Sequence, residues 1–187
     1  MGLDNGGVVK PSIAHIMLAA VDTVAPTAAA IDGLSATAPV LAGWTNFGHT
    51  SLANDFSPFL EGGESTVEGS RQLAKLRETV AATTEGLVVS SMQTTSEILQ
   101  LTYGGGTTPS AGRFVIPSTS TPIERAALIV YFDGNVIVAE YHSKSSIRRD
   151  GAIRNAASGW LEFPIRMTWL QGANADEWIG ETIDVLV

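Results

Sequence analysis

The stretch LIVYFDGNVIVAEY, residues 128–141, constrains the fold of this chain more than any other. Asp133, Gly134 and Asn135 separate two apolar runs, and Asp-Gly supplies the positive φ angles that tight hairpin turns require. Both runs are apolar at consecutive positions and not only at alternate ones, as in strands that are buried on both sides. The sequence therefore predicts an antiparallel hairpin with both faces covered.

Alternation of apolar and polar residues predicts further strands. The clearest case is FPIRMTW, where four apolar side chains share one face of a half-buried strand: Phe163, Ile165, Met167 and Trp169. Residues 76–93 form a long extended segment rich in Val and Thr, with an expected kink or bulge at Gly86. Other strands are expected near 114–116 and close to the N-terminus, where Pro11 marks an edge or a start.

A single short α-helix is predicted at about residues 95–103. Thr95 or Ser96 can cap its first turn, and Gly104 can end it. Residues 23–42, rich in Ala, Thr and Pro, read as a loop. With seven or more strands and one helix, the chain is expected to be mainly β, a sandwich or barrel with a long inter-strand loop and extended terminal arms.

The length of the chain fits one domain. Its 187 residues are 44% hydrophobic and only 16% charged, which is enough to bury one sizeable core. Within a single domain over 1–187, we expect an N-terminal arm and strand at 1–20, a long loop at 43–75, and the remaining sandwich with its helix at 76–187. The loop is turn-rich, and no helical or strand periodicity can be traced through residues 43–65.

Composition excludes several classes of function. The net charge of −8 is opposite to that of proteins that grip nucleic acid by neutralising phosphates. The absence of cysteine excludes disulfides, thiol nucleophiles and cysteine-ligated zinc. The longest apolar run, residues 126–132, is far too short to cross a bilayer, and the N-terminus lacks the apolar core of a signal peptide, so no membrane partner is expected.

Residues that could carry chemistry do not form a recognisable catalytic or metal-binding pattern. His15, His49 and His142 lie in separate segments, without the close spacing or neighbouring carboxylates of a typical metal site. No G-x-S-x-G elbow precedes a helix, and the run 104–106 follows a helix where a phosphate loop would open one. Paired carboxylates such as Asp176/Glu177 are more typical of solvated loops than of a glycosidase site. We expect no enzyme activity, no cofactor and no metal.

Three motifs in a fixed order carry a resemblance to a known family. GWTNFGHTS is followed by EGGES and then by LRETVAATTEGLVVSSMQTTSEILQLTYGGG, together about residues 40–106. This order is similar to that in the major tail tube proteins of long-tailed, non-contractile bacteriophages, particularly those that infect actinobacteria. The resemblance implies a tail-tube-type β-sandwich that forms hexameric rings, which stack into a hollow tube for DNA ejection.

The resemblance also implies the surroundings of such a protein. It would be a structural component of the virion, assembled in the host cytoplasm. Its main partner would be itself, with tail terminator, tape measure and tail-tip proteins at the ends of the tube. Double-stranded DNA would be present only in transit, without specific binding.

Three sets of residues are then expected to serve assembly and conduction. Aromatic residues of the long loop would contact a neighbouring ring or subunit, unless the loop folds back on its own barrel: Trp44, Phe47, Phe56 and Phe59. A basic group would pair with acidic segments of another copy: Lys144, Arg148, Arg149 and Arg154. A small, polar strand face would line the lumen, or would be an ordinary solvent-facing strand: Thr79, Ala81, Thr83 and Glu85.

Two interpretations from other classes remain open at this point. A monomeric carbohydrate-binding β-sandwich module could use Trp44 and Trp160 as stacking platforms. A hydrolase would need a pocket in which acidic groups converge with perturbed pKa values.

Overall fold

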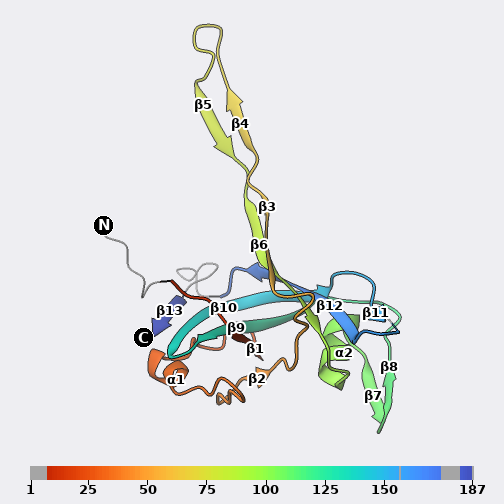
Figure 1. The fold of residues 1–187 in the computed structure, drawn as a ribbon. Helices are drawn as coiled ribbons and strands as arrows, with labels where there is room; N and C mark the ends of the chain where they lie inside the picture. The colour runs from red at the N-terminus through yellow and green to blue at the C-terminus, as the bar shows by residue number, and fades with distance from the viewer. Residues whose placement is uncertain (1–7, 156, 174–181, 187) are drawn as a thin grey trace.

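The computed structural model describes residues 8–155, 157–173 and 182–186, the last five by their backbone. Nine of the thirteen strands in these residues form one large antiparallel sheet (Figure 1). Its central path runs β2-β1-β9-β10-β12-β6-β3, with β11 added to β12 and β13 added to β10. Its strands are β1 (Ile13–Ala19), β2 (Thr45–Asn46), β3 (Ser57–Gly62), β6 (Thr83–Ser91), β9 (Ile123–Asp133), β10 (Val136–Arg149), β11 (Arg154–Asn155), β12 (Leu161–Leu170) and β13 (Thr182–Leu186).

The predicted central hairpin is confirmed. Asp133 pairs with Val136, so Gly134 and Asn135 make a two-residue turn in which Gly134 has a φ of 59°. Successive residues of β9 pack on opposite sides of the sheet, and Leu128, Ile129 and Val130 are all at most 1% exposed. Both faces are therefore covered, as the consecutive apolar residues indicated.

Two hydrophobic clusters lie on the two faces of the sheet. One contains Ile129 and the four apolar residues predicted for β12, and it is covered by α2 (Ser96–Tyr103) through Ile98 and Leu101. The other contains Leu128 and Val130, and it is covered by α1 (Ala28–Asp32) through Ile31. The mainly β prediction is confirmed, in the form of a large antiparallel sheet with two short helices.

The helix predicted at about 95–103 is confirmed with its caps. The Thr95 side chain accepts a hydrogen bond from the backbone N–H of Ile98, and Gly104 ends α2 in the left-handed conformation. Helix α1 corrects the prediction that 23–42 is a loop throughout. Thr27 caps it in the same way, but five residues are too few to show helical periodicity in a sequence.

The strand prediction for 76–93 needs one correction. The segment forms β5 (Arg77–Val80) and β6, and the break between them falls at Ala81 and Ala82 instead of at Gly86. Gly86 lies inside β6, where a Cβ atom would sit 2.1 Å from the carbonyl oxygen of Met167 and 2.6 Å from the ring of Phe59. Glycine is required there by close packing and not by a bulge.

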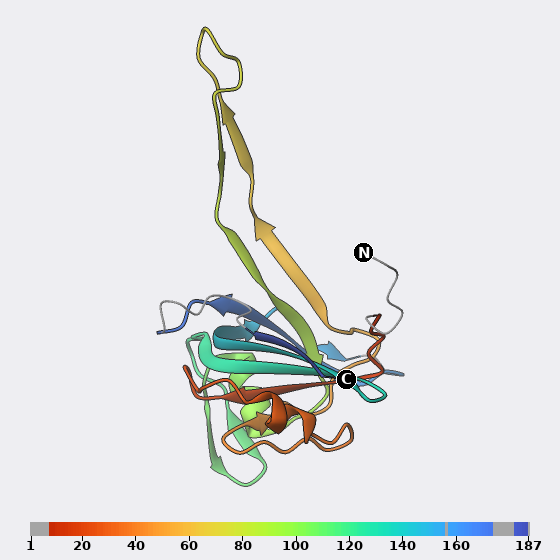
Figure 2. The ribbon, with the colours of Figure 1, turned by 90° about the vertical axis from the view of Figure 1, so that its left-hand side faces the viewer.

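The segment 43–75, expected to be a loop, contains three strands. Besides β2 and β3 it forms β4 (Ser65–Glu68), and residues 47–56 remain an irregular inter-strand loop. The pairs β3–β6 and β4–β5 follow one another and make a long hairpin that projects from the body (Figures 1 and 2). A second, shorter hairpin consists of β7 (Thr107–Ser110) and β8 (Arg113–Val115).

The strands predicted near 114–116 and close to the N-terminus are confirmed as β8 and β1. The outer part of the predicted N-terminal arm, residues 1–7, lies outside the described residues, as do Asp176 and Glu177. The division into a single domain over 1–187 stays a prediction.

Candidate interaction surface

The projecting hairpin, residues 57–91, is called the arm below. Its stem is paired from Ser57 opposite Val88 to Gly62 opposite Thr83, and pairing resumes from Ser65 opposite Val80 to Glu68 opposite Arg77. At the joint between the two ladders Gly62 and Gly63 have φ angles of 85° and 75°, a conformation that side chains disfavour. The glycine pair of the EGGES motif therefore allows the chain to change direction between the inner and the outer ladder of the arm.

The outer part of the arm exposes apolar side chains. Every residue from 64 to 85 is exposed, and five large apolar residues of the arm are more than half accessible: Leu60, Val67, Leu73, Leu76 and Val80. A two-stranded ribbon is marginally stable in water unless another element packs on it. Apolar area left uncovered on a single chain is typical of a surface that another molecule covers.

Charge is distributed unevenly along the arm. Its stem carries five glutamates: Glu61, Glu64, Glu68, Glu78 and Glu85. Residues 69–77, called the tip below, carry Arg71, Lys75 and Arg77 and no acidic residue. The arm thus has a basic, leucine-bearing tip on an acidic stem.

Arg166 on β12 fastens the base of the arm. Its Nη2 lies 2.7 Å from Oε2 of Glu61, and its guanidinium lies 3.6 Å from the centre of the Phe59 ring. The Arg166 side chain is only 14% exposed, so its cation–π contact is partly desolvated, whereas Glu61 is 59% exposed and the ion pair is open to solvent on that side. These contacts hold the stem in a defined direction relative to the sheet.

The four loop aromatics predicted as contacts to a neighbour pack on their own chain. Phe47 is 3% exposed inside the core, which corrects its assignment because almost none of its surface is left for a partner. Trp44 meets Tyr141 edge to face, and Phe56 meets Tyr131 in the same way. Phe59 lies under Arg166. Trp44, Phe56 and Phe59 are half-buried and keep part of their surface exposed, so a contact of these three with another copy stays a prediction.

The basic group divides in two. Lys144 pairs with Glu124 at 3.1 Å, and Arg154 lies 3.5 Å from the buried carboxylate of Glu162, so both have partners in their own chain. Arg148 and Arg149 are exposed at the end of β10, and within the described residues no ion pair involves either of them. Pairing with another copy stays a prediction for these two.

The four residues predicted to line a lumen are all exposed along the arm. Thr79 lies on β5, Ala81 lies in the joint, and Thr83 and Glu85 lie on β6. These four positions were assigned to one face because every second residue of a continuous strand points to the same side. The strand is interrupted at the joint, so this assignment does not hold across Ala81. Their role stays a prediction.

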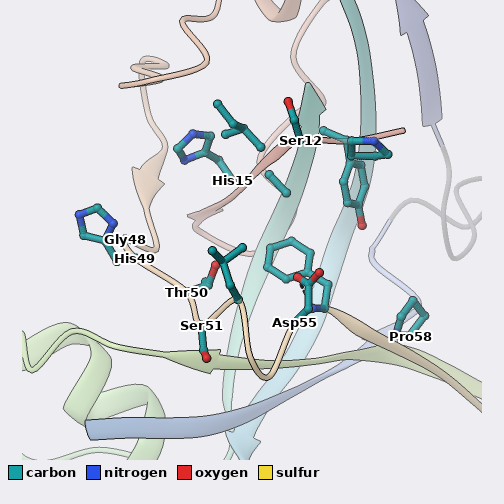
Figure 3. Close-up of a pocket in the computed structure, with 14 residues that line it drawn as sticks. Ser12, His15, Gly48, His49, Thr50, Ser51, Asp55 and Pro58 are labelled. Carbon is teal, nitrogen blue, oxygen red and sulfur yellow. Dashed lines mark hydrogen bonds between the residues drawn. The ribbon is translucent and has the colours of Figure 1, made fainter. Parts of the chain in front are cut away.

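A hollow of about 570 Å³ opens at the base of the arm, beside the start of β3 (Figure 3). It is lined by the first half of β1, by the loop from Gly48 to Leu52, and by Asp55, Phe56, Pro58 and Tyr131. Glu162, 6% exposed, keeps this loop in place, because its carboxylate accepts hydrogen bonds from the Ser51 hydroxyl and, at 2.6 Å, from the Asn54 amide. We call this cavity the basal hollow.

Burial raises the pKa of the Tyr131 phenol to about 12, and the negative charges of Glu140 and Asp55 add to the effect. The unfolded chain releases this proton near 10.0, whereas the folded chain keeps it to about 12. Tyr131 therefore leaves stability unchanged below pH 10 and lowers it as the pH rises from 10 to 12. The absorbance difference at tyrosinate wavelengths between the native protein and Tyr131→Phe should titrate near pH 12, and a midpoint near 10 would contradict the burial of this phenol.

The structure gives no support to a metal site among the described residues, where no group of three or more His, Asp or Glu side chains could hold an ion. His15 and His49 do line the same hollow (Figure 3), but the ring of His15 bonds to the carbonyl of Ala36. None of the described helices is long and apolar enough for a transmembrane span. Of the two proposed glycan platforms, Trp160 is 74% exposed, whereas Trp44 is partly buried against Tyr141.

Sequence analysis predicts one side of the arm, in the extended segment 76–93, but expects its other side to be a loop, because β4 is short and faces solvent on both sides. STVE and RETV are rich in β-branched residues, and the polar stretch between them carries a turn. This pair of segments is the feature of the sequence that could have indicated a hairpin. Without a buried face, a ribbon has no apolar alternation to display.

The chain is similar to known proteins over nearly its whole length. The family model described as phage tail tube protein matches residues 1–186. The major tail protein Gp23 of Mycobacterium phage L5 is 31% identical over 192 aligned positions, which cover 98% of this chain and 96% of the relative. The major tail protein Gp23 of Mycobacterium phage D29 shows the same identity and coverage.

Proposed function

Since this chain belongs to the phage tail tube protein family, as a structural component of the virion tail and not an enzyme, we propose that its copies form hexameric rings that stack into the tube. The tube would be the conduit through which DNA leaves the capsid. The family itself implies self-assembly into a tube. The number of copies in a ring, the stacking and the conduit are the proposed part.

The observation that carries the proposal is the arm. It projects beyond the body, its base is fastened by Arg166, and its outer part exposes leucine and valine side chains. Such a ribbon would be a liability on a protein that works as a monomer. It is explained if the arm of each copy lies on a neighbouring copy and bridges successive rings.

The negative net charge of the chain supports its proposed role as a conduit for DNA. The chain carries 19 acidic and 11 basic residues, so a wall built from its copies repels the phosphates of passing DNA. The candidates for this wall are Thr79, Ala81, Thr83 and Glu85. At the ends of the tube, the protein would contact tail terminator, tape measure and tail-tip proteins. Arg148 and Arg149 are candidates for charge pairing between copies.

Electron microscopy of the purified full-length protein, with size-exclusion chromatography and light scattering, tests the proposal. We expect six-fold rings or long tubes with an open bore, and a map at side-chain resolution would show which residues face that bore. A protein that stays a monomer at millimolar concentration would contradict the proposal and would favour a binding module with Trp160 as its stacking platform.

A further inference from the structure

The tip of the arm has the properties of a docking element. Hydrogen bonds between Ser70 and Leu73 close a turn, and the N–H of Leu76 donates to the carbonyl of Glu68 at 2.8 Å. The side chains of Leu73 and Leu76 are 53% and 65% exposed. A closed turn of this kind loses little conformational freedom when it binds. Three positive charges with no acidic residue accompany these leucines.

The basal hollow combines an acidic group with apolar side chains. Asp55 lines it beside Phe56, Leu52 and Tyr131. An adjoining smaller hollow of about 120 Å³ shares Pro58 and Tyr131 with it and is lined by Glu85 and Glu140. Neither Lys nor Arg is among the described residues that line the two hollows. The apolar residues Leu52, Phe56 and Tyr131 can therefore contact leucine side chains, while the acidic residues attract a basic segment.

From this complementarity we propose that the tip of one copy docks in the basal hollow of another copy. The inference rests on the proposed assembly into a tube, and it names the surface on which the arm lands. A tip cannot reach the hollow of its own chain. At about 3.3 Å per residue, the dozen residues from Pro58 to Ser70 place the tip about 40 Å from the base, and the two lie at opposite ends of the arm (Figures 1 and 2).

The contact is heterologous, because the tip of each copy meets a different surface on the next one. A heterologous contact repeats in one direction until it closes a ring or continues as a filament. In a stack of rings, each arm would reach from its own body to the base of an arm in the adjacent ring. The tip and the hollow lie at the two ends of the arm, so each copy inside a stack can give one such contact and receive another.

A charge swap tests the docking. In the tip-reversed variant, Arg71 and Lys75 become Glu, whereas Arg77 is left unchanged because it lies opposite Glu68 in the ladder of the arm. In the hollow-reversed variant, Asp55 becomes Lys. We expect each alone to raise the critical concentration for assembly at least tenfold, and the chain that carries both sets to recover most of the loss. Arg113→Glu, on the separate hairpin β7–β8, is the control for a charge reversal outside the tip and should assemble like the native chain.

The outcomes separate the docking from the proposed function. If the tip-reversed chain folds and forms tubes at the same concentration as the native chain, the docking proposal is wrong, whereas the proposed assembly into a tube is supported. Lack of recovery in the combined variant overturns the choice of the hollow as the receiving surface. If the native chain forms no rings or tubes at all, the proposed function itself fails.

Cross-linking gives a second readout that does not depend on the yield of tubes. Since the chain has no cysteine, Leu73→Cys with Leu52→Cys introduces one thiol in the tip and one in the hollow. In assembled material a short bis-maleimide should join copies into a ladder on a denaturing gel. Leu73→Cys with Ile116→Cys, whose second position is exposed outside the hollow, should not. Equal ladders for the two pairs would overturn the proposal.

Discussion

A chain that lacks residues 64–81 is expected to fold and to lose the ability to form tubes. The deletion joins Gly63 to Ala82, which leaves a two-residue turn after the pair Gly62–Thr83. Gly63 already has a positive φ, as the first position of such a hairpin turn requires. No residue between 64 and 81 is buried, so the core keeps all of its contacts.

The expected loss of assembly is large. The deletion removes four exposed apolar side chains, those of Val67, Leu73, Leu76 and Val80, together with the basic tip. If each contributes about 1 kcal/mol when covered by a neighbour, their loss costs about 4 kcal/mol for each contact. That corresponds to roughly a thousandfold in the association constant. Sedimentation velocity over a concentration series measures this shift.

The thermal midpoint is the control for the deletion. It should change by only a few degrees, because the deleted ribbon lies outside both hydrophobic clusters. A shortened chain that still forms tubes at the native concentration would show that the arm is not the bridging element. A chain that unfolds would show that the arm supports the fold, contrary to the exposure of its residues.

Gly86→Ala is expected to destabilise the body by about 2–4 kcal/mol, since overpacking of this kind typically costs 1–3 kcal/mol and more where backbone must move. The new Cβ would lie 2.1 Å from the carbonyl oxygen of Met167, which belongs to the neighbouring strand and cannot rotate away. It would also displace the Phe59 ring from beneath Arg166. The pairing of β6 with β12 and with β3 would both be disturbed.

Thermal unfolding measures this effect. For a chain of this size, about 3 kcal/mol corresponds to a fall of roughly 6–12 °C in the midpoint. Gly151→Ala is the matched control, because no atom lies within 4 Å of its added Cβ and its φ is not positive. Equal midpoints for the two variants would contradict the close packing at Gly86.

The features that the sequence predicted correctly share a local cause. Asp133 and Gly134 dictate a turn through their own backbone preferences, and Thr95 and Gly104 mark the ends of α2 in the same way. The alternation in β12 reports a strand with one face in the core, and the structure buries all four residues of that face. Each of these patterns can be recognised within a dozen residues.

The features that sequence analysis missed depend on contacts between distant segments. Phe47 was expected to meet a neighbour, but its backbone N–H donates to the carbonyl of Ile16 and its ring enters the core. Gly86 was expected to mark a bulge, but Met167 and Phe59 require it. The outer ribbon of the arm, β4 with β5, showed no apolar alternation, because these two strands bury no face in their own chain.

Residue preferences and apolar spacing were therefore enough to establish a mainly β chain with a central hairpin and a capped helix, and the order of three motifs was enough to indicate the tail tube family. The folded chain added the direction of the arm, the glycine joint within it, the hollow with acidic groups at its base and the burial of Phe47. The physical reason is that backbone preferences act between neighbouring residues, whereas burial and charge complementarity arise only when residues far apart in the chain are brought together.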